Sequence, residues 1–299
     1  MAFQSLDDMT AELAAGKAWR ADWNKITGAV AYTAGNWYDM SQPAGNPVAN
    51  AYTGTALNAQ VPTDATGWGI WHGGNVTADT KQVLNASAFS AVATAVPGVL
   101  MLVDVALYYP GINLLTTTAA QTLVNGSSLT RHTTGAGLRA FMVATALTGT
   151  PTGTPMMTMS YTNQAGTAGR ALGATVNFTA GAANVPTPGK LAHSGVAANN
   201  HAPFLPLASG DTGIRSVQSV TMTTNYGGAT TITGALVLAK PLLSVPIVTL
   251  GVAGERNTIF QIPSSVVIPD GACLTWLYFA GANTAAATSI MGHVDFGWG

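Results

Sequence analysis

From Ile26 onwards, the chain is a succession of short apolar runs rich in Thr, Val and Ala, separated at short intervals by Gly, Pro and Asn. Several of these runs alternate apolar and polar residues, and none keeps the periodicity of an amphipathic helix. Runs of this length with turn residues between them are typical of a β-sandwich or β-barrel. We expect strands at residues 99–109, 138–147, 156–162, 171–178, 214–225, 230–239, 247–252, 258–262, 273–279 and 290–296.

Two pairs of these segments are predicted to form hairpins. One has its tip at residues 163–166, and the other turns at residues 226–228, between the segments 214–225 and 230–239. In the latter pair, Ile214 and Val217 are out of phase, which indicates a β-bulge. Strands do not alternate with helices, so a parallel α/β sheet is not expected. The sequence therefore predicts an all-β chain folded as a jelly-roll-like antiparallel β-sandwich.

The N-terminal region differs from the rest of the chain. A Ser-x-x-Asp pattern at Ser5 and apolar residues at helical spacing predict a short helix over residues 6–15, ended by Gly16. The following region up to residue 85 is rich in Asn, Gly, Pro and aromatic residues, which indicates an extended arm or loop layer. We therefore divide the chain into residues 1–85, the helix and arm or loop layer, and residues 86–299, the β-sandwich body.

Large aromatic residues are concentrated in this N-terminal region and at the last strand segment. Trp19 and Trp23 are four residues apart, which is the spacing of a second helical turn. We favour their packing on the body, and the alternative is an N-terminal arm that docks on a partner. Phe296 and Trp298 need cover from the chain's own core or from a neighbouring subunit. The interface candidates are Trp19, Trp23, Trp37, Trp68, Trp71, Phe296 and Trp298.

The charge content is unusually low. Only 8% of the residues are charged, against about 25% in typical soluble domains, and the net charge is −1. A free monomer normally keeps more surface charge to stay apart from its neighbours. The composition is therefore typical of a membrane protein, of an uncharged secreted protein, or of a subunit whose faces are buried in an assembly.

Sequence features disfavour the first two classes and nucleic-acid binding. The longest charge-free apolar stretch, residues 88–103, contains a Pro-Gly pair and is shorter than the roughly 20 residues of a membrane-spanning helix. Asp7 and Asp8 stand where a secretory signal carries basic residues. Cys273 is the only cysteine, so neither a disulfide nor a cysteine zinc site is expected. The eleven Lys and Arg residues are scattered, which disfavours phosphate binding.

The histidines are not arranged for catalysis in the sequence. His293 and Asp295 share one face of a predicted strand, and we interpret them as a pair at the end of a sheet rather than as metal ligands. His193 precedes Ser194, but adjacent side chains on a strand point apart, so this histidine is not positioned to activate the serine. We therefore expect no catalytic residue, no metal site, no cofactor and no enzymatic activity.

Asp104 lies inside the most apolar predicted strand. A buried carboxylate must be paired with a hydrogen-bond donor or a cation. Arg139, Arg215 and Arg256 each lie inside or beside an apolar segment. Two alternatives remain open, namely an Asp104–arginine pair within the chain and a salt bridge between subunits.

The C-terminal third of the chain resembles the virion structural proteins of tailed bacteriophages. The resemblance is carried by GDTGIRSVQSVT at 210–221, ALVLAKPL at 235–242 and IPDGACLTWLYFAGANTAAATSIMGHVDFGWG at 268–299. It implies a non-enzymatic capsid or tail subunit that is located in the virion. A helix, an arm and a β-body are compatible with a capsid decoration, or cement, protein, and the long spine helix expected of a major head protein is not seen in the sequence.

Three functions follow from these observations. The leading hypothesis is a homo-oligomeric virion protein, with a trimer favoured, that acts as a capsid decoration or shell subunit and contacts copies of itself and the major capsid protein. The alternative is a tail or fibre component that binds host-surface glycan through Trp37, Tyr52, Trp68 or Trp71. The third is a hydrolase, which the absence of a nucleophile–base pair in the sequence disfavours.

Overall fold

The computed structural model describes residues 3–28, 31–91, 97–115, 119–152, 155–177, 188–194, 202–224, 227–247, 253–261 and 265–299. The fold is 50% strand and 6% helix, with several antiparallel sheets that include a near-closed barrel. The predicted all-β class is therefore confirmed, with its antiparallel packing, its short N-terminal helix and its extended N-terminal loop region.

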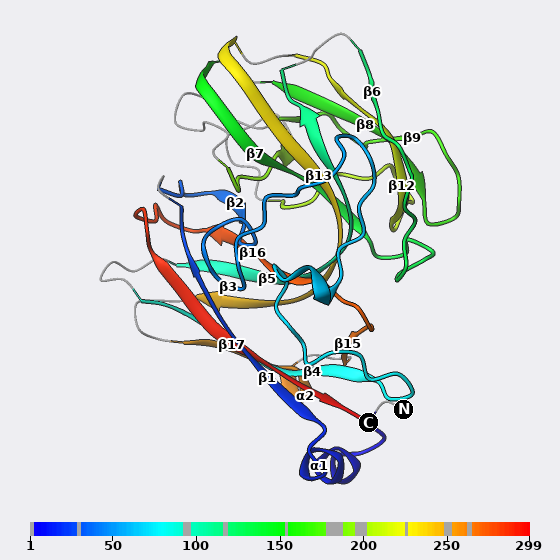
Figure 1. The fold of residues 1–299 in the computed structure, drawn as a ribbon, viewed down its shortest axis with the longest axis vertical. Coiled ribbons are helices and arrows are strands. Elements are labelled where there is room, and N and C mark those ends of the chain that lie inside the picture. Colours follow the sequence, from blue (N-terminus) through cyan, green and yellow to red (C-terminus); the bar gives the residue numbers. More distant parts are fainter. Residues whose placement is uncertain are drawn as a thin grey trace.

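A barrel occupies the centre of the molecule (Figure 1). Its strand order is β2 (Asn36–Asp39), β16 (Leu274–Ala280), β5 (Gly98–Asn113), β13 (Gly227–Ile247) and β7 (Arg139–Thr152). Residues 190–191 connect the two outer strands, because Lys190 bridges to Tyr38 in β2 and Leu191 bridges to Val143 in β7. This segment nearly closes the sheet and covers backbone groups that an open edge exposes.

The sheet that holds both ends of the chain, here called the terminal sheet, lies below the barrel in Figure 1. Its order is β14 (Gly254–Asn257), β4 (Lys81–Ser90), β17 (Ser289–Trp298), β1 (Ala18–Ile26) and β3 (Gly45–Asn46), with β15 (Val266–Ile268) also paired to β4. Helix α1 (Leu6–Ala14) contacts β17, and α2 (Thr258–Gln261) contacts β4. Both helices therefore pack against strands of the terminal sheet.

A third sheet, here called the distal sheet, lies on the opposite side of the barrel (Figure 1). Its order is β11 (His193–Ser194), β10 (Val176–Asn177), β8 (Met156–Asn163), β12 (Ile214–Met222) and β6 (Gln121–Thr122), with β9 (Arg170–Ala171) beside β8. A 3₁₀ turn, η1 (Asp64–Thr66), lies in the loop layer before β4.

The long strand β5 contributes to three apolar cores. Val103 and Val105 belong to the core inside the barrel, Leu102 packs with the terminal sheet, and Leu107 and Tyr109 pack with the distal sheet. Successive side chains of a strand point to opposite faces, so a strand covered on both faces is apolar along most of its length. The terminal sheet and the distal sheet thus each pack their apolar face against the outer surface of the same barrel.

The loop layer between β3 and β4 covers the barrel. Tyr52 and Trp68 insert into the barrel core, with their ring centroids 5.8 Å apart. The Tyr52 hydroxyl donates a 2.6 Å hydrogen bond to the Asp39 carboxylate, which also accepts from the Ser41 hydroxyl. Asp39 is fully buried, so these bonds replace the water that its carboxylate lost on folding.

Helix α1 confirms the predicted N-terminal helix. The backbone N–H of Asp8 donates to the Ser5 side chain at 3.0 Å, which satisfies one of the free amides of the first turn. The helix ends before Gly16, whose φ of +84° is the left-handed conformation that glycine adopts without strain. No residue of α1 is fully buried, so its apolar face is only partly covered by the body.

The expectation that Trp19 and Trp23 extend a helical turn is wrong. Both residues lie in β1, which pairs with β17 over its whole length in the register Trp19–Phe296 and Trp23–Gly292. Side chains of a strand alternate between its two faces with a period of two residues. A spacing of four therefore also places both rings on one face of a strand. The long-range pairing with β17 decides between the two structures, and it makes this segment part of the body.

The boundary predicted between residues 85 and 86 falls inside β4. In addition, β1 and β4 both pair with β17, on its two sides. Elements from both predicted segments therefore form one sheet.

One of the two predicted hairpins forms. At residues 163–166 the N–H of Gly166 donates to the Asn163 carbonyl, and β9 and β10 pair with β8. The other is wrong, because β12 pairs with β8 and β6 in the distal sheet whereas β13 pairs with β5 and β7 in the barrel. The expected bulge in β12 is confirmed by a register shift between Ile214 and Ser216.

Asp104 is fully buried and paired within the chain. Its carboxylate accepts from the Arg131 guanidinium at 2.9–3.0 Å, from His132 Nε2 at 2.9 Å and from the Cys273 N–H at 3.0 Å. Burial raises the pKa of Asp104, but the hydrogen bonds from His132 and Arg131 outweigh it and hold the pKa below its usual value. The intramolecular alternative is therefore confirmed, but the partner is Arg131 rather than Arg139, Arg215 or Arg256.

Candidate functional site

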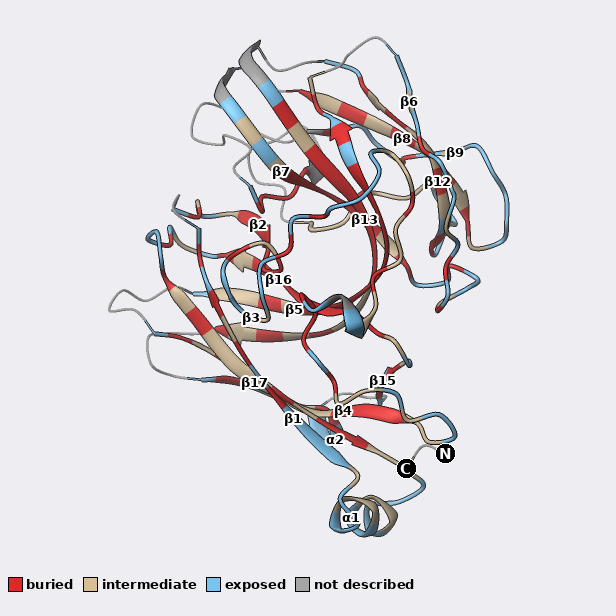
Figure 2. Cartoon of the chain, viewed as in Figure 1, coloured by how far each residue is buried: buried red, intermediate tan, exposed pale blue. Residues whose placement is uncertain are grey.

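Exposed apolar side chains gather around the terminal sheet. Nine large hydrophobic residues of the described part of the chain are exposed, and eight of them belong to this sheet, its helices or the loops beside it. Figure 2 shows the exposed residues on α1 and along β1. The eight are Leu6, Trp19, Ile26, Val48, Trp71, Ile259, Phe260 and Val267, and the ninth is Val124 near the distal sheet. Six of the eight line two grooves: Trp19, Val48 and Trp71 line one, and Leu6, Ile259 and Phe260 line the other.

The first groove, here called the aromatic groove, has a volume of ≈ 660 Å³ and runs beside β1. The rings of Trp19 and Trp71 meet edge to face at 4.6 Å, and the Trp19 indole N–H donates to the Trp71 carbonyl at 3.1 Å. Trp71 is 50% exposed and Trp19 38% exposed. The contact therefore orients both rings while leaving much of their surface open to a partner.

The backbone before β4 positions Trp71. Ile70 donates its N–H to the Leu274 carbonyl, and both Ile70 and His72 are buried, so Trp71 between them points outward. Lys81 holds the segment in place, because its ammonium donates to the carbonyls of His72 and Gly74 and lies 2.9 Å from His72 Nδ1. The exposure of Trp71 is thus built into a fixed loop.

Trp19 is positioned by a close approach of the loop to β1. Gly73 lies against its indole, where a Cβ atom would stand 2.9 Å from Trp19 Cγ. Gly73 also has a φ of +85°, which strains other residues. A side chain at position 73 therefore displaces Trp19 or bends the loop.

Polar groups line the outer side of the aromatic groove. Arg20 forms a two-point ion pair with Asp295, at 2.6 and 3.0 Å, which raises the pKa of the guanidinium. Asp22 is exposed, and its carbonyl accepts from the Asn46 side chain at 3.0 Å. The groove therefore combines aromatic surface with one basic side chain, Arg20, and two acidic ones, Asp22 and Asp64.

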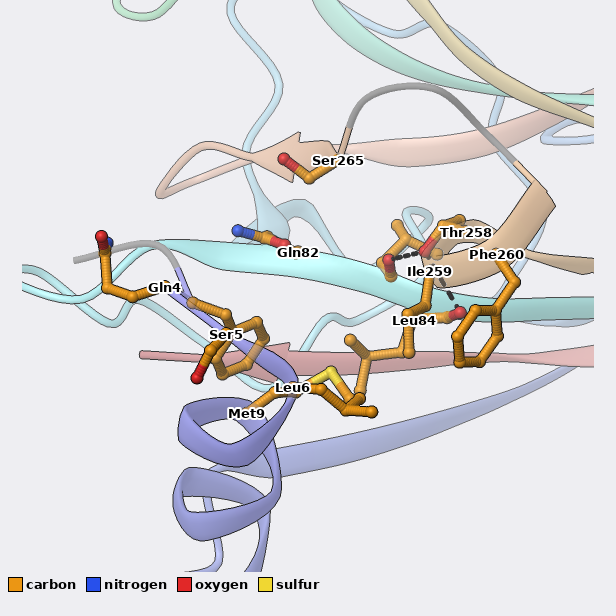
Figure 3. Close-up of a pocket in the computed structure, with 12 residues that line it drawn as sticks. Gln4, Ser5, Leu6, Met9, Gln82, Leu84, Thr258, Ile259, Phe260 and Ser265 are labelled. Atoms are coloured by element: carbon orange, nitrogen blue, oxygen red, sulfur yellow. Dashed lines mark hydrogen bonds between the residues drawn. The ribbon is translucent and has the colours of Figure 1, made fainter.

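The second groove, here called the helical groove, lies between α1, β4 and α2 and has a volume of ≈ 340 Å³ (Figure 3). Leu6 and Met9 of α1 face Leu84 across it, and Phe260 projects at its far end. Phe260 is 76% exposed. Thr258 ties α2 to β4 by donating its hydroxyl to the carbonyls of Val83 and Leu84. The helices thus form an apolar rim on one edge of the terminal sheet.

The structure brings only two of the seven predicted interface residues together at the surface, Trp19 and Trp71. Four others are covered by the chain's own cores, with exposed fractions of at most 8%: Trp23, Trp37, Trp68 and Phe296. Trp298 is half-buried, and the Lys81 ammonium lies 5.2 Å from the centre of its ring. The aromatics of the last strand therefore find cover within the chain.

A serine, a histidine and an aspartate meet across three positions of the terminal sheet. Ser87 Oγ lies 2.9 Å from His293 Nδ1, and His293 Nε2 lies 3.6 Å from Asp295. Sequence reasoning missed Ser87 because it reaches His293 only through the pairing of β4 with β17. Asp295 is already engaged on both oxygens by Arg20, so it is not free to orient the histidine as a catalytic aspartate does.

The remaining histidines form no separate catalytic group among the described side chains. His132 contacts Asp104 at the buried junction, and His72 contacts Lys81. The side chains of His193 and Ser194 and the whole of His201 lie outside the described residues. Within the described ranges, no group of three or more His, Cys, Asp or Glu residues has the arrangement of a metal site.

In the same part of the chain, no helix has both the length and the apolarity that a membrane crossing requires. Comparisons with protein-family models, with curated proteins and with solved structures find no match to this chain.

Proposed function

We propose that the chain is a non-enzymatic structural subunit of a tailed-phage virion, associated with the capsid as a decoration or shell protein. One observation carries the proposal: eight of the nine large hydrophobic residues that are exposed in the described part of the chain lie around the terminal sheet. Exposed apolar side chains gathered at a groove mark an interaction site, and six of the eight line the two grooves. The particle type is drawn from the resemblance of residues 210–221, 235–242 and 268–299 to virion proteins.

The grooves offer a physical basis for cohesion. Both grooves expose apolar area from which a partner would displace water: Phe260 and Leu6 at the helical groove, and Trp71 at the aromatic groove. Such area contributes about 25 cal/mol per Å² before the loss of motional freedom is counted. With 8% charged residues the surface requires few ions to be desolvated. Contacts of moderate strength then hold a shell together because they are repeated.

The proposed partners are other copies of the chain and other virion proteins, with the major capsid protein foremost. The trimer favoured from the sequence stays a prediction.

The test replaces apolar residues of the helical groove by a charge. Phe260→Asp and Leu6→Asp are expected to lower the number of copies per purified particle by about tenfold or more, because a buried unpaired carboxylate opposes contact. Val124→Asp, at the distal sheet, is the matched control and is expected to leave occupancy unchanged. Circular dichroism verifies that all three variants fold. Equal occupancy of the Phe260 variant and the wild type contradicts the proposal.

The aromatic groove favours a second candidate function, the binding of a host-surface glycan. Trp71 presents an open indole beside Trp19 and the carboxylates of Asp22 and Asp64. Aromatic faces next to hydrogen-bonding groups suit sugar rings. Shearing tails from heads separates the candidates: a capsid subunit stays with DNA-filled heads, whereas a glycan-binding tail protein leaves with the tails. Trp71→Ala lowers attachment of particles to host cells only under the second candidate.

A further inference from the structure

A third groove lies at the distal sheet, on the opposite side of the barrel from the terminal sheet. Its volume is ≈ 530 Å³, and its walls come from the hairpin tip at Gly166, from the first residues of β12 and from the loop after β6. We call it the donor groove, because its described lining holds one cation, Arg215, and five hydroxyl side chains but no carboxylate. Such a lining favours a ligand that carries negative charge and accepts hydrogen bonds.

The cation of the donor groove has no acidic partner within the described structure. Arg215 is exposed, and its guanidinium forms neither an ion pair nor a hydrogen bond with the described residues. Asp211 is nearby in the sequence, but it accepts from the Arg170 guanidinium at 2.9 Å. Tyr161 and Asn163 also donate to this carboxylate, at 2.6 and 2.8 Å. Arg215 is therefore available to the anion of a ligand.

The hydroxyl groups of the donor groove have protons left for a ligand. Gln218 Nε2 donates to Thr162 Oγ1 at 2.9 Å and to Ser216 Oγ at 3.2 Å. With the amide in this orientation, each of the two hydroxyls accepts from the chain and keeps its own proton to donate. The other three hydroxyls form no hydrogen bond with the described residues: Ser127, Ser128 and Thr133.

Both walls of the donor groove are held in place by the chain. On the loop side, Asn125 Oδ1 accepts from the Tyr109 hydroxyl at 2.6 Å, and its Nδ2 donates to the Val217 carbonyl at 3.0 Å. On the hairpin side, Gly166 approaches the guanidinium so closely that a Cβ atom would stand 3.2 Å from Arg215 Nη1. The donors are thus positioned before a ligand arrives, which lowers the entropic cost of binding.

We propose that the donor groove binds an acidic sugar, with the carboxylate on Arg215 and the ring hydroxyls on the hydroxyl side chains. One guanidinium offers two parallel N–H groups, which match the two oxygens of one carboxylate. A sugar hydroxyl donates and accepts, as each hydroxyl of the lining does. The volume is that of a small-ligand pocket rather than of a bare ion. Leu107 and Leu129 supply apolar surface for the C–H groups of the ring.

Charge separates this site from the aromatic groove. There, Arg20 is already bonded to both oxygens of Asp295. Asp22 and Asp64 also line that groove, so it repels an anion. An acidic sugar is therefore expected at the donor groove alone, and Trp71→Ala is expected to leave its affinity unchanged.

The first experiment measures the binding of glucuronate to the purified full-length chain by saturation-transfer NMR and calorimetry at constant ionic strength. Glucose is the matched neutral ring, and acetate is the matched carboxylate without a ring. We expect glucuronate to bind about tenfold or more tightly than either, because only glucuronate uses the guanidinium and the hydroxyls together. Equal affinity for glucose or for acetate overturns the proposal.

The second experiment removes the donors one at a time. Arg215→Met is expected to weaken glucuronate binding by about tenfold or more, since a hydrogen-bonded ion pair is lost. Lys240→Met removes the same charge outside this groove and is the matched control, with unchanged affinity. Thr133→Val, which is similar in shape, is expected to weaken binding by about threefold to tenfold. Circular dichroism verifies that the variants fold.

Two outcomes of the second experiment contradict the site. Glucuronate binding that persists in Arg215→Met overturns the proposal, as does an equal loss of affinity in Lys240→Met. All measurements use the purified chain alone, so they are independent of the virion proposal. A chain that is absent from particles but binds glucuronate refutes the virion function and leaves the donor groove standing, and a chain that is incorporated but does not bind glucuronate does the reverse.

Discussion

The terminal and distal sheets pack on the same barrel, yet they present different surfaces to water. In the distal sheet, β8 alternates strictly, with Met157, Met159 and Tyr161 buried and polar uncharged residues between them. In the terminal sheet, β15 has an apolar residue on its exposed side as well, Val267. Both sheets turn apolar residues inward, so they differ only in their outward residues. Polar outward residues indicate a side that faces water, and apolar outward residues indicate a side that contacts a partner.

The same difference extends to the strand edges and helices. Residues 190–191 bridge the two outer strands of the barrel, whereas β1 in the terminal sheet keeps an open edge. The terminal sheet also carries α1 and α2, whose Leu6 and Phe260 project into solvent. Open backbone and exposed apolar surface thus coincide in one half of the molecule.

The largest effect on the free energy of unfolding is expected at the Asp104–Arg131 pair, in the barrel between the terminal and distal sheets. Arg131→Met leaves the Asp104 carboxylate buried without its main cation, and we expect a loss of about 3–5 kcal/mol in the free energy of unfolding. Urea denaturation measures this loss and is expected to show one transition, because both sheets share β5. The exposed Arg215 supplies the control Arg215→Met, with a change within about 0.5 kcal/mol. Two separate transitions contradict the shared interior.

Core truncations test whether the two interiors are equivalent. Phe296→Ala in the terminal core and Met142→Ala in the distal core both empty fully buried sites, and we expect each to lower the free energy of unfolding by about 2–5 kcal/mol. Phe260→Ala removes an equally large ring from the surface and is expected to change it by about 0.5 kcal/mol or less. A Phe260 effect as large as that of Phe296 means that α2 is part of the core.

The buried lysines of the terminal half give a smaller, pH-dependent effect. Burial lowers the pKa of Lys25 and of Lys81 to about 8. Because the unfolded chain keeps these protons up to about pH 10.4, it binds more protons than the folded chain between the two values, and stability rises with pH there. We expect each of the two lysines to contribute a rise of at most about 2 kcal/mol in the free energy of unfolding from pH 8 to pH 10.

The size of that rise depends on what surrounds the ammonium groups. Lys25 donates to the carbonyls of Ser41, Pro43, Pro47 and Val48, and these bonds favour the charged form and so limit the rise. Lys25→Met is expected to flatten the pH profile, and Lys240→Met, at a partly exposed position, is the matched control. A profile equally steep in Lys25→Met and in the wild type contradicts the assignment.

Local signals in the sequence predict a large part of this fold. Ser5 and Gly16 delimit α1 because a cap and a left-handed terminator act over a few residues. The turn at residues 163–166 and the bulge after Ile214 are local in the same sense. Most of the expected strands follow from apolar alternation, which reflects one face on a core. The strand expected at residues 258–262 is wrong, because Thr258–Gln261 form the helix α2.

Contacts between distant residues account for what the sequence did not predict. Trp19 and Trp23 have a spacing that suits a helix and a strand alike, and only β17 decides between them. Arg131 lies in an irregular loop of Ser, Thr and Gly, with no local sign that it reaches Asp104. The aromatic groove likewise depends on a loop contact between Trp19 and Trp71, which no periodicity encodes.

Hydroxyl-radical footprinting of the associated protein, in particles or in concentrated solution, tests most directly whether the terminal half is the contact side. Side-chain oxidation is compared with that of the dilute chain. We expect protection of Trp19, Trp71 and Phe260 and unchanged reactivity of Val124. All four side chains are exposed in the single chain, but only the first three lie at the terminal sheet. Protection of Val124 with reactive Trp71 and Phe260 would contradict the account.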